Sequence, residues 1–137
     1  MKVVIRAGVA LVLASTTALG GIRMWEGGGP KVKDGYRVYV DRLAGGLPTG
    51  CWGVTKHSTD EAVIVGDVWS AERCERTLAM HATKNGMGIL DCVSAPLTQP
   101  QFDAMIVFAH NVGITAACAS RAFALLEAGK TDEGCNA

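Results

Sequence analysis

The sequence predicts an α+β fold, in which a small β-hairpin lobe and a helical lobe follow an N-terminal apolar helix. Three observations support this prediction. An apolar run occupies most of the first 22 residues, glycine-rich turns interrupt strand-like alternation between residues 36 and 55, and helix-forming segments fill the chain from residue 70 onward. A run of strands followed by a run of helices is the pattern of an α+β domain.

The composition is that of a single domain without an overall charge bias. The chain has 137 residues, 49% of them hydrophobic, and a mean hydropathy of +0.23. Its 13 basic and 13 acidic residues give a formal net charge of zero, so the whole chain offers no argument for nucleic-acid binding. Between residues 22 and 57, six basic residues outnumber three acidic ones, and this local excess suits an anionic polymer.

Residues 1–22 have the features of an export signal. Lys2 and Arg6 precede an uncharged run of 16 residues that ends before Arg23. The run is shorter than the roughly 20 residues of a stable membrane span, and it is rich in small and hydroxyl residues. Three outcomes stay open: a signal peptide cleaved near residues 18–20, a permanent anchor, or a weak anchor that is later released. Length and composition disfavour the permanent anchor, and the poor cleavage site favours release.

Two strands are predicted after this segment. A helix that includes residues 22–26 should end at the Gly-Gly-Gly-Pro run of residues 27–30. Tyr36–Val40 alternates apolar and polar side chains and predicts a strand, and Pro48–Thr55 is its predicted partner across a Gly-Gly turn. Val63–Val65 is either a third short strand or a packed loop.

The first helix of the second half is predicted to begin after Ser70. A serine at this position can cap the helix with its side-chain oxygen, and Glu72 in the first turn suits the helix dipole. Gly86 and Gly88 are expected to interrupt whatever continues from it.

Two further helices follow. Thr98 and Gln101 have the spacing of a capping box, which predicts a helix over residues 99–111. Apolar residues on nearly all its sides predict that this helix is buried. Thr115 is predicted to cap a last helix over residues 116–128, with Gly129 as the residue that ends it.

Two carboxylates and a hydroxyl lie on separate local elements of the glycine-rich region. Glu26 closes the first predicted helix, Asp41 ends the first strand, and Thr49 lies on its partner strand. Cleavage of a glycosidic bond needs one acid to protonate the leaving oxygen and a second carboxylate to direct a water or stabilise the sugar cation. This pattern therefore points to glycoside hydrolysis.

The order Glu26, Asp41, Thr49, followed by Cys51 and Gly53, resembles the catalytic segment of the phage lysozyme family of muramidases. The run from Pro96 to Gly113 resembles the core helix of that family, so the resemblance covers about Trp25 to Cys135. The intervals between the three residues are longer than the usual ones, and longer hairpin loops cost little. Relative to the family pattern the chain also looks C-terminally truncated, because it stops inside the next expected helix.

The resemblance implies a lysozyme-like domain over residues 23–137 that needs no cofactor and no metal. It would be an endolysin of the signal-anchor-release type that hydrolyses the β-1,4 bond between N-acetylmuramic acid and N-acetylglucosamine with inversion, for host-cell lysis. Glu26 would be the general acid, and Asp41 with Thr49 would hold the attacking water.

The implied partners and location follow from the same resemblance. They are peptidoglycan glycan strands and, through residues 1–22, the inner membrane, with no nucleic acid and a monomeric state in the periplasm. The alternative is a degenerate, non-catalytic lysozyme-like protein that binds the cell wall.

Five cysteines in an exported chain this short predict disulfides, and the odd count leaves one cysteine over. Two bridges among five cysteines allow 15 arrangements, and the residues alone select none of them. The resemblance implies a bridge between Cys51 and Cys74, and it leaves the pairing of Cys92, Cys118 and Cys135 open. No two cysteines have the Cys-x2-Cys spacing of a zinc site, and the three histidines His57, His81 and His110 show no ligand spacing either.

Overall fold

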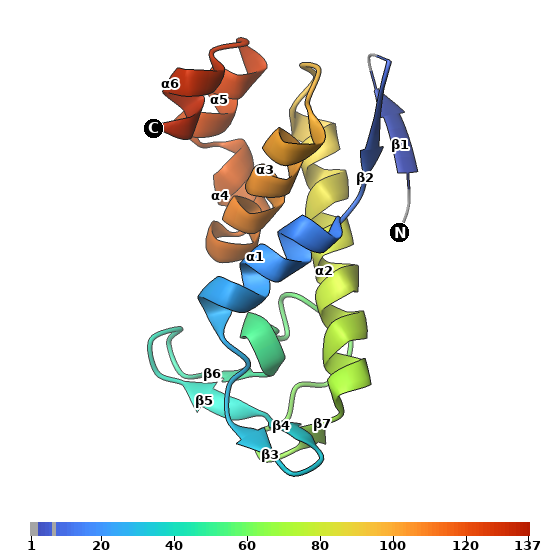
Figure 1. The fold of residues 1–137 in the computed structure, drawn as a ribbon. Helices are drawn as coiled ribbons and strands as arrows, with labels where there is room; N and C mark the ends of the chain where they lie inside the picture. The colour runs from blue at the N-terminus through green and yellow to red at the C-terminus, as the bar shows by residue number, and fades with distance from the viewer. Residues whose placement is uncertain (1–2, 7) are drawn as a thin grey trace. The chain divides into compact units, whose positions relative to one another are not determined.

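The computed structural model describes residues 3–6 and 8–137, with nothing described for the side chain of Val9 (Figure 1). The chain divides into two compact units, and their boundaries fall inside helices α1 (Thr16–Glu26) and α2 (Ala71–Cys92). One unit holds residues 19–81, and the other holds the N-terminal segment to residue 18 together with residues 82–137. This is the mixed α+β arrangement that the sequence predicts.

The unit of residues 19–81 carries the small sheets. One sheet has the order β3 (Lys31–Val32), β4 (Gly35–Arg37), β7 (Val68–Trp69), and all its pairs are antiparallel. A separate hairpin pairs β5 (Tyr39–Asp41) with β6 (Leu47–Thr49), and a short 3-10 turn, η1 (Cys51–Gly53), follows it. The buried apolar side chains of this unit are those of Ile22, Val38, Cys51, Trp52, Val54, Trp69, Cys74 and Leu78.

The predicted strand Tyr36–Val40 is split in the structure. The backbone N–H of Val38 donates to Asp67 O (2.8 Å) and its carbonyl accepts from Gly66 N (3.0 Å), so the residue between β4 and β5 pairs with the chain before β7. The sequence allows either a strand or a loop for Val63–Val65, and in the structure this segment lies outside the strands. The partner strand, predicted over Pro48–Thr55, is shorter in the structure. It ends at Thr49, because the η1 turn begins two residues later.

The other unit is mainly helical. Besides the end of α2 it contains α3 (Gln99–Val112), α4 (Ile114–Cys118), α5 (Arg121–Glu127) and α6 (Thr131–Cys135). These helices surround a core that the N-terminal segment helps to build, formed by Leu11, Leu13, Ile89, Val93, Leu97, Phe102, Met105, Ile106 and Ala109.

The expected N-terminal apolar helix is wrong for the described residues. β1 (Val3–Arg6) and β2 (Val9–Val12) form an antiparallel hairpin around Gly8, which has φ of +78°, and a helix begins only at Thr16. Valine and isoleucine dominate both strands, and these residues favour extended backbone. Within the described residues, no helix has the length and apolar character needed to cross a membrane.

Hydrogen bonds join the N-terminal segment to the start of α3. The side-chain amide of Gln99 pairs with the backbone of Val12, accepting from its N–H (2.5 Å) and donating to its carbonyl (2.9 Å). Ser15 Oγ donates to Asp103 Oδ2 (2.5 Å), and Gln99 also donates to Asp103 Oδ1 (2.8 Å). Asp103 is buried, and these bonds satisfy both its oxygens.

The predicted helix ends are confirmed at three places. α1 ends at Glu26, immediately before Gly27 with φ of +65°. Ser70 Oγ accepts from Arg73 N (3.1 Å) at the start of α2. Thr98 and Gln101 form both bonds of the capping box at the start of α3.

Two helix predictions are wrong. Gly86 and Gly88 do not interrupt α2, because other side chains use the space that their missing Cβ atoms leave, Leu13 and Phe102 at the first and Ile114 at the second. Thr115 does not cap a long last helix.

Ser120 caps α5 instead, accepting from Phe123 N (3.2 Å), so the predicted last helix is divided into two. Gly129 is still the residue that follows the end of the helix, as predicted, because α5 ends at Glu127 with Ala128 as its C-cap. The N–H of Gly129 donates to Leu126 O and that of Lys130 to Leu125 O, which is the Schellman arrangement.

The two helical glycines Gly88 and Gly20 make a matched test of this packing. A Cβ on Gly88 would lie 2.5 Å from Ile114 Cγ1, whereas one on Gly20 in α1 would meet nothing within 4 Å. We expect Gly88→Ala to lower the free energy of unfolding by about 1–3 kcal/mol through overpacking. Gly20→Ala should raise it by up to about 1 kcal/mol through helix propensity. Urea denaturation followed by circular dichroism measures both, and equal stability of the two variants would contradict the packing described.

Candidate active site

The β5–β6 hairpin brings two of the predicted site residues to one face. Tyr39 pairs with Thr49, Val40 with Pro48, and Asp41 with Leu47. Since side chains alternate along a strand and paired residues share a face, Tyr39, Asp41 and Thr49 lie on the same side of the ladder. The hairpin is the green-blue pair labelled β5 and β6 in Figure 1.

The Asp41 carboxylate organises the turn of this hairpin. Its Oδ1 accepts from the backbone N–H groups of Leu43 (2.9 Å) and Ala44 (3.2 Å), and its carbonyl accepts from Gly46 N (2.8 Å). Among the residues that the structure describes, none donates to the other oxygen, Oδ2. One oxygen therefore fixes the carboxylate, and the second is available to a water or a substrate.

The side chain of Thr49 is buried. It is only 1% exposed, and its Oγ1 donates to the carbonyl of Leu47 (3.1 Å). Because the hydroxyl proton is already in a hydrogen bond within the strand, Thr49 Oγ1 can interact with a water only as an acceptor.

Glu26 is the last residue of α1, and its side chain is exposed. The glycines after it pass close to two tyrosine rings. A Cβ on Gly28 would lie 2.6 Å from Tyr36 Cε1, and one on Gly29 would lie 2.8 Å from Tyr39 Cε1. Only residues without a side chain permit this approach, so the glycine run lays the chain that follows Glu26 against the tyrosines.

The charges of both carboxylates act on the phenol of Tyr39. The pKa of its phenol is raised, first by burial, then by the negative charge of Asp41 and then by that of Glu26. Both carboxylates thus act on one half-buried hydroxyl. Sequence reasoning missed Tyr39, although its position two residues before Asp41 in an alternating strand places it on the same face.

The turn after Thr49 is anchored on both sides. Cys51 forms a disulfide with Cys74 of α2, which is the pair that the resemblance implied. Trp52 adopts a left-handed backbone conformation (φ 53°, ψ 41°), and its ring lies 5.6 Å from that of Tyr36 and 5.3 Å from the Arg23 guanidinium. Arg23 also forms an ion pair with Glu75.

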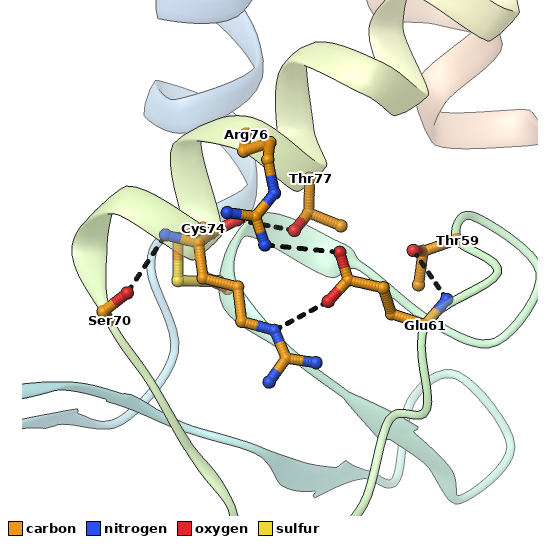
Figure 2. A network of polar contacts seen from close by, with 8 residues as sticks. Thr59, Glu61, Ser70, Cys74, Arg76 and Thr77 are labelled. Carbon is orange, nitrogen blue, oxygen red and sulfur yellow. Dashed lines mark hydrogen bonds and ion pairs between the residues drawn. A yellow bond between two sulfur atoms is a disulfide. The ribbon is translucent and has the colours of Figure 1, made fainter.

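An ion-pair network fixes the loop between η1 and β7 (Figure 2). Glu61 accepts from Arg73 Nε (2.9 Å) and Arg76 Nη2 (3.5 Å), and its own N–H donates to Thr59 Oγ1 (3.1 Å). The Arg73 guanidinium lies 4.0 Å from the Trp69 ring centre. This network ties the loop to the first turns of α2, from which Cys74 reaches the η1 turn.

The described part of the helical unit holds none of the three predicted catalytic residues. Cys92 is bonded to Cys118, and Cys135 is free and exposed. An apolar groove of about 290 Å³ is lined by residues of α3, α5 and α6 and the C-terminus, including Met105, Phe108 and Phe123. In the described part of the chain, no cluster of three or more His, Cys, Asp or Glu residues could hold a metal ion.

Comparisons with known proteins agree on one family. A family model described as phage lysozyme matches residues 31–137, a range that includes Asp41 and Thr49 and begins after Glu26. No curated protein matches the sequence. Among solved structures, the endolysin from Escherichia coli O157:H7 phage FAHEc1 is 27% identical with a TM-score of 0.71, over 88% of this chain and 72% of the endolysin.

A second similar structure is the muramidase domain of SpmX from Asticaccaulis excentricus. It is 25% identical with a TM-score of 0.68, and the match covers 88% of this chain and 73% of that domain.

Proposed function

We propose that this chain, which belongs to the phage lysozyme family, is a muramidase that hydrolyses the β-1,4 bond between N-acetylmuramic acid and N-acetylglucosamine in peptidoglycan. The observation that carries the proposal is the hairpin register, which puts Asp41 and Thr49 on one face, together with the packing of Gly29, three residues after Glu26, against Tyr39 of that face. Two similar solved structures, an endolysin and a muramidase domain, support the same assignment.

Glu26 serves as the general acid in this proposal. It ends α1 and is exposed, so its carboxyl group can reach the glycosidic oxygen of a bound glycan strand. Contact with the sugar chain would then exclude water from this carboxyl group.

Asp41 directs the attacking water. Its Oδ1 is held by two backbone N–H groups, which leaves Oδ2 as the acceptor for a proton of the water. Thr49 Oγ1, which donates to Leu47, retains lone pairs for a second contact with that water. An inverting reaction of this kind calls for carboxyl groups roughly 6.5–9.5 Å apart.

The surface charge of this unit suits the substrate. Its basic residues outnumber the acidic ones between residues 22 and 57, and five of the six are exposed, namely Lys31, Lys33, Arg37, Arg42 and Lys56. Peptidoglycan carries carboxylates on its sugars and peptides, and a basic surface raises its local concentration. The proposed setting is the periplasm during host-cell lysis, with the protein acting as a monomer.

Two conservative variants test the catalytic roles. We expect the full chain to release reducing sugar from purified Gram-negative peptidoglycan, and Glu26→Gln and Asp41→Asn each to lower the rate about 10²–10⁴-fold. An Asn at position 41 can still accept from Leu43 and Ala44, so the turn should persist. Asp60→Asn changes an exposed loop carboxylate and should leave the rate unchanged.

The outcomes separate the alternatives. Unchanged hydrolysis by Glu26→Gln would refute the proposed acid. Binding of peptidoglycan without turnover by the parent chain would instead favour the non-catalytic, cell-wall-binding alternative.

For the N-terminus we infer release of a weak anchor, with the segment retained in the soluble protein. Leu11, Leu13 and Ala14 are at most 1% exposed, and Val12 and Ser15 are hydrogen-bonded to α3. Cleavage near residues 18–20 would remove all of these contacts and open the core of the helical unit. Retention of the segment after its release from the membrane keeps that core complete.

Mass spectrometry of the soluble periplasmic form tests this inference. We expect an intact N-terminus, and a form that starts near Gly21 would show that an ordinary signal peptide is cleaved. Replacing Gly8, Gly20 and Gly21 by leucine should strengthen the anchor and hold more of the protein in the membrane fraction. A chain that leaves the membrane equally well with the three leucines would contradict a weak anchor.

A further inference from the structure

Tyr39 shares a strand face with two of the proposed catalytic residues and packs against the chain that follows the third. It lies opposite Thr49 in the hairpin, two residues before Asp41 on the same strand face, and its ring contacts the backbone that follows Glu26. We propose that Tyr39 is a positioning residue, whose ring and hydroxyl together hold the carboxylates of Glu26 and Asp41 in a fixed relation. As a role in catalysis, this inference rests on the proposed function.

The ring supplies the mechanical part of this role. Gly29 has φ of +74° and lies so close to the ring that a methyl group there would approach Tyr39 Cε1 to 2.8 Å. The segment from Glu26 to Gly29 is short, and the contact at its end limits where α1 can deliver the Glu26 side chain. Tyr36 makes the equivalent contact with Gly28, but Tyr36 lies on β4, whereas the hairpin with Asp41 begins at Tyr39.

The hydroxyl supplies the electrostatic part. The charged groups that act on it are Asp41 on its own strand and Glu26 at the end of α1. Its neighbour on β6 is Thr49, which does not titrate, and Gly29 has no side chain. Because burial and both charges raise the pKa of Tyr39, the phenol stays neutral at the pH of lysis and can donate a hydrogen bond where two negative charges meet.

A neutral hydroxyl near both carboxylates can donate a hydrogen bond to one of them and so restrict where that carboxylate lies. Loss of the hydroxyl should therefore lower the rate of hydrolysis while the fold persists.

The chain is well suited to a direct measurement, because it contains only two tyrosines, Tyr36 and Tyr39. In a Tyr36→Phe background, the absorbance of the phenolate at alkaline pH reports Tyr39 alone. We expect its titration midpoint to lie above the usual value of about 10. The midpoint should fall when either Glu26→Gln or Asp41→Asn is added, whereas Asp60→Asn should leave it in place. Circular dichroism over the same pH range verifies that each variant stays folded.

Activity supplies the second readout. Tyr39→Phe keeps the ring and its contact with Gly29, so the fold should persist. We expect it to lower kcat about tenfold or more while KM stays close to that of the parent chain. Tyr36→Phe is the matched control, and its kcat and KM should equal those of the parent chain.

The results separate this inference from the proposed function. A midpoint that responds to both carboxylates supports the position of Tyr39 even if the parent chain does not cleave peptidoglycan, in which case only the proposed function fails. A midpoint that responds to neither carboxylate, or to one alone, overturns the inference. So does a kcat of Tyr39→Phe that equals the kcat of an active parent chain.

Discussion

The register of the β5–β6 hairpin is the constraint on which the candidate site depends. A slip of one residue in the pairing would put Thr49 on the face opposite to Tyr39 and Asp41. Three features hold the register: the Asp41 carboxylate caps the turn, Val38 directs the chain from one sheet into the next, and the disulfide at Cys51 fixes the end of β6. The same carboxylate that organises the turn is thus the one proposed to direct the water.

A second constraint acts in the helical unit, where polar groups stabilise the segment that the sequence marks as apolar. Gln99 pairs with the backbone of Val12 as a neighbouring strand would, and Asp103 accepts from Ser15 and Gln99. A buried carboxylate with both oxygens satisfied specifies one arrangement, because each broken bond would leave a polar group without a partner. The packing of Leu11 and Leu13 beside this network gives the N-terminal segment a role in the folded core.

The sequence predicts those features that short-range chemistry decides. The end of α1 before Gly27, the Ser70 cap and the Thr98–Gln101 capping box depend on a few neighbouring residues, and the structure contains all of them. The continuation of α2 through its glycines depends on contacts with distant residues, and so does the attachment of the N-terminal segment to α3. No local pattern can report such contacts.

The features of the candidate site also divide into those that the sequence predicts and those that depend on distant contacts. Glu26, Asp41 and Thr49 were found through a family resemblance, and the hairpin register explains why the last two belong together. The burial of Thr49 and the place of Tyr39 beside Gly29 are consequences of how the glycine run packs, which the residue order does not contain.

The most direct test of the account is to locate the bound glycan. In the full chain with Glu26→Gln, which should bind without cleaving, a soluble peptidoglycan tetrasaccharide can be titrated while backbone amide shifts are recorded by NMR. The account predicts the largest shifts at Gly27 and Gly29 after the proposed acid, and at Leu43 and Ala44, whose N–H groups donate to Asp41. Largest shifts along the apolar groove at Ala104, Phe108 and Leu126 would contradict it.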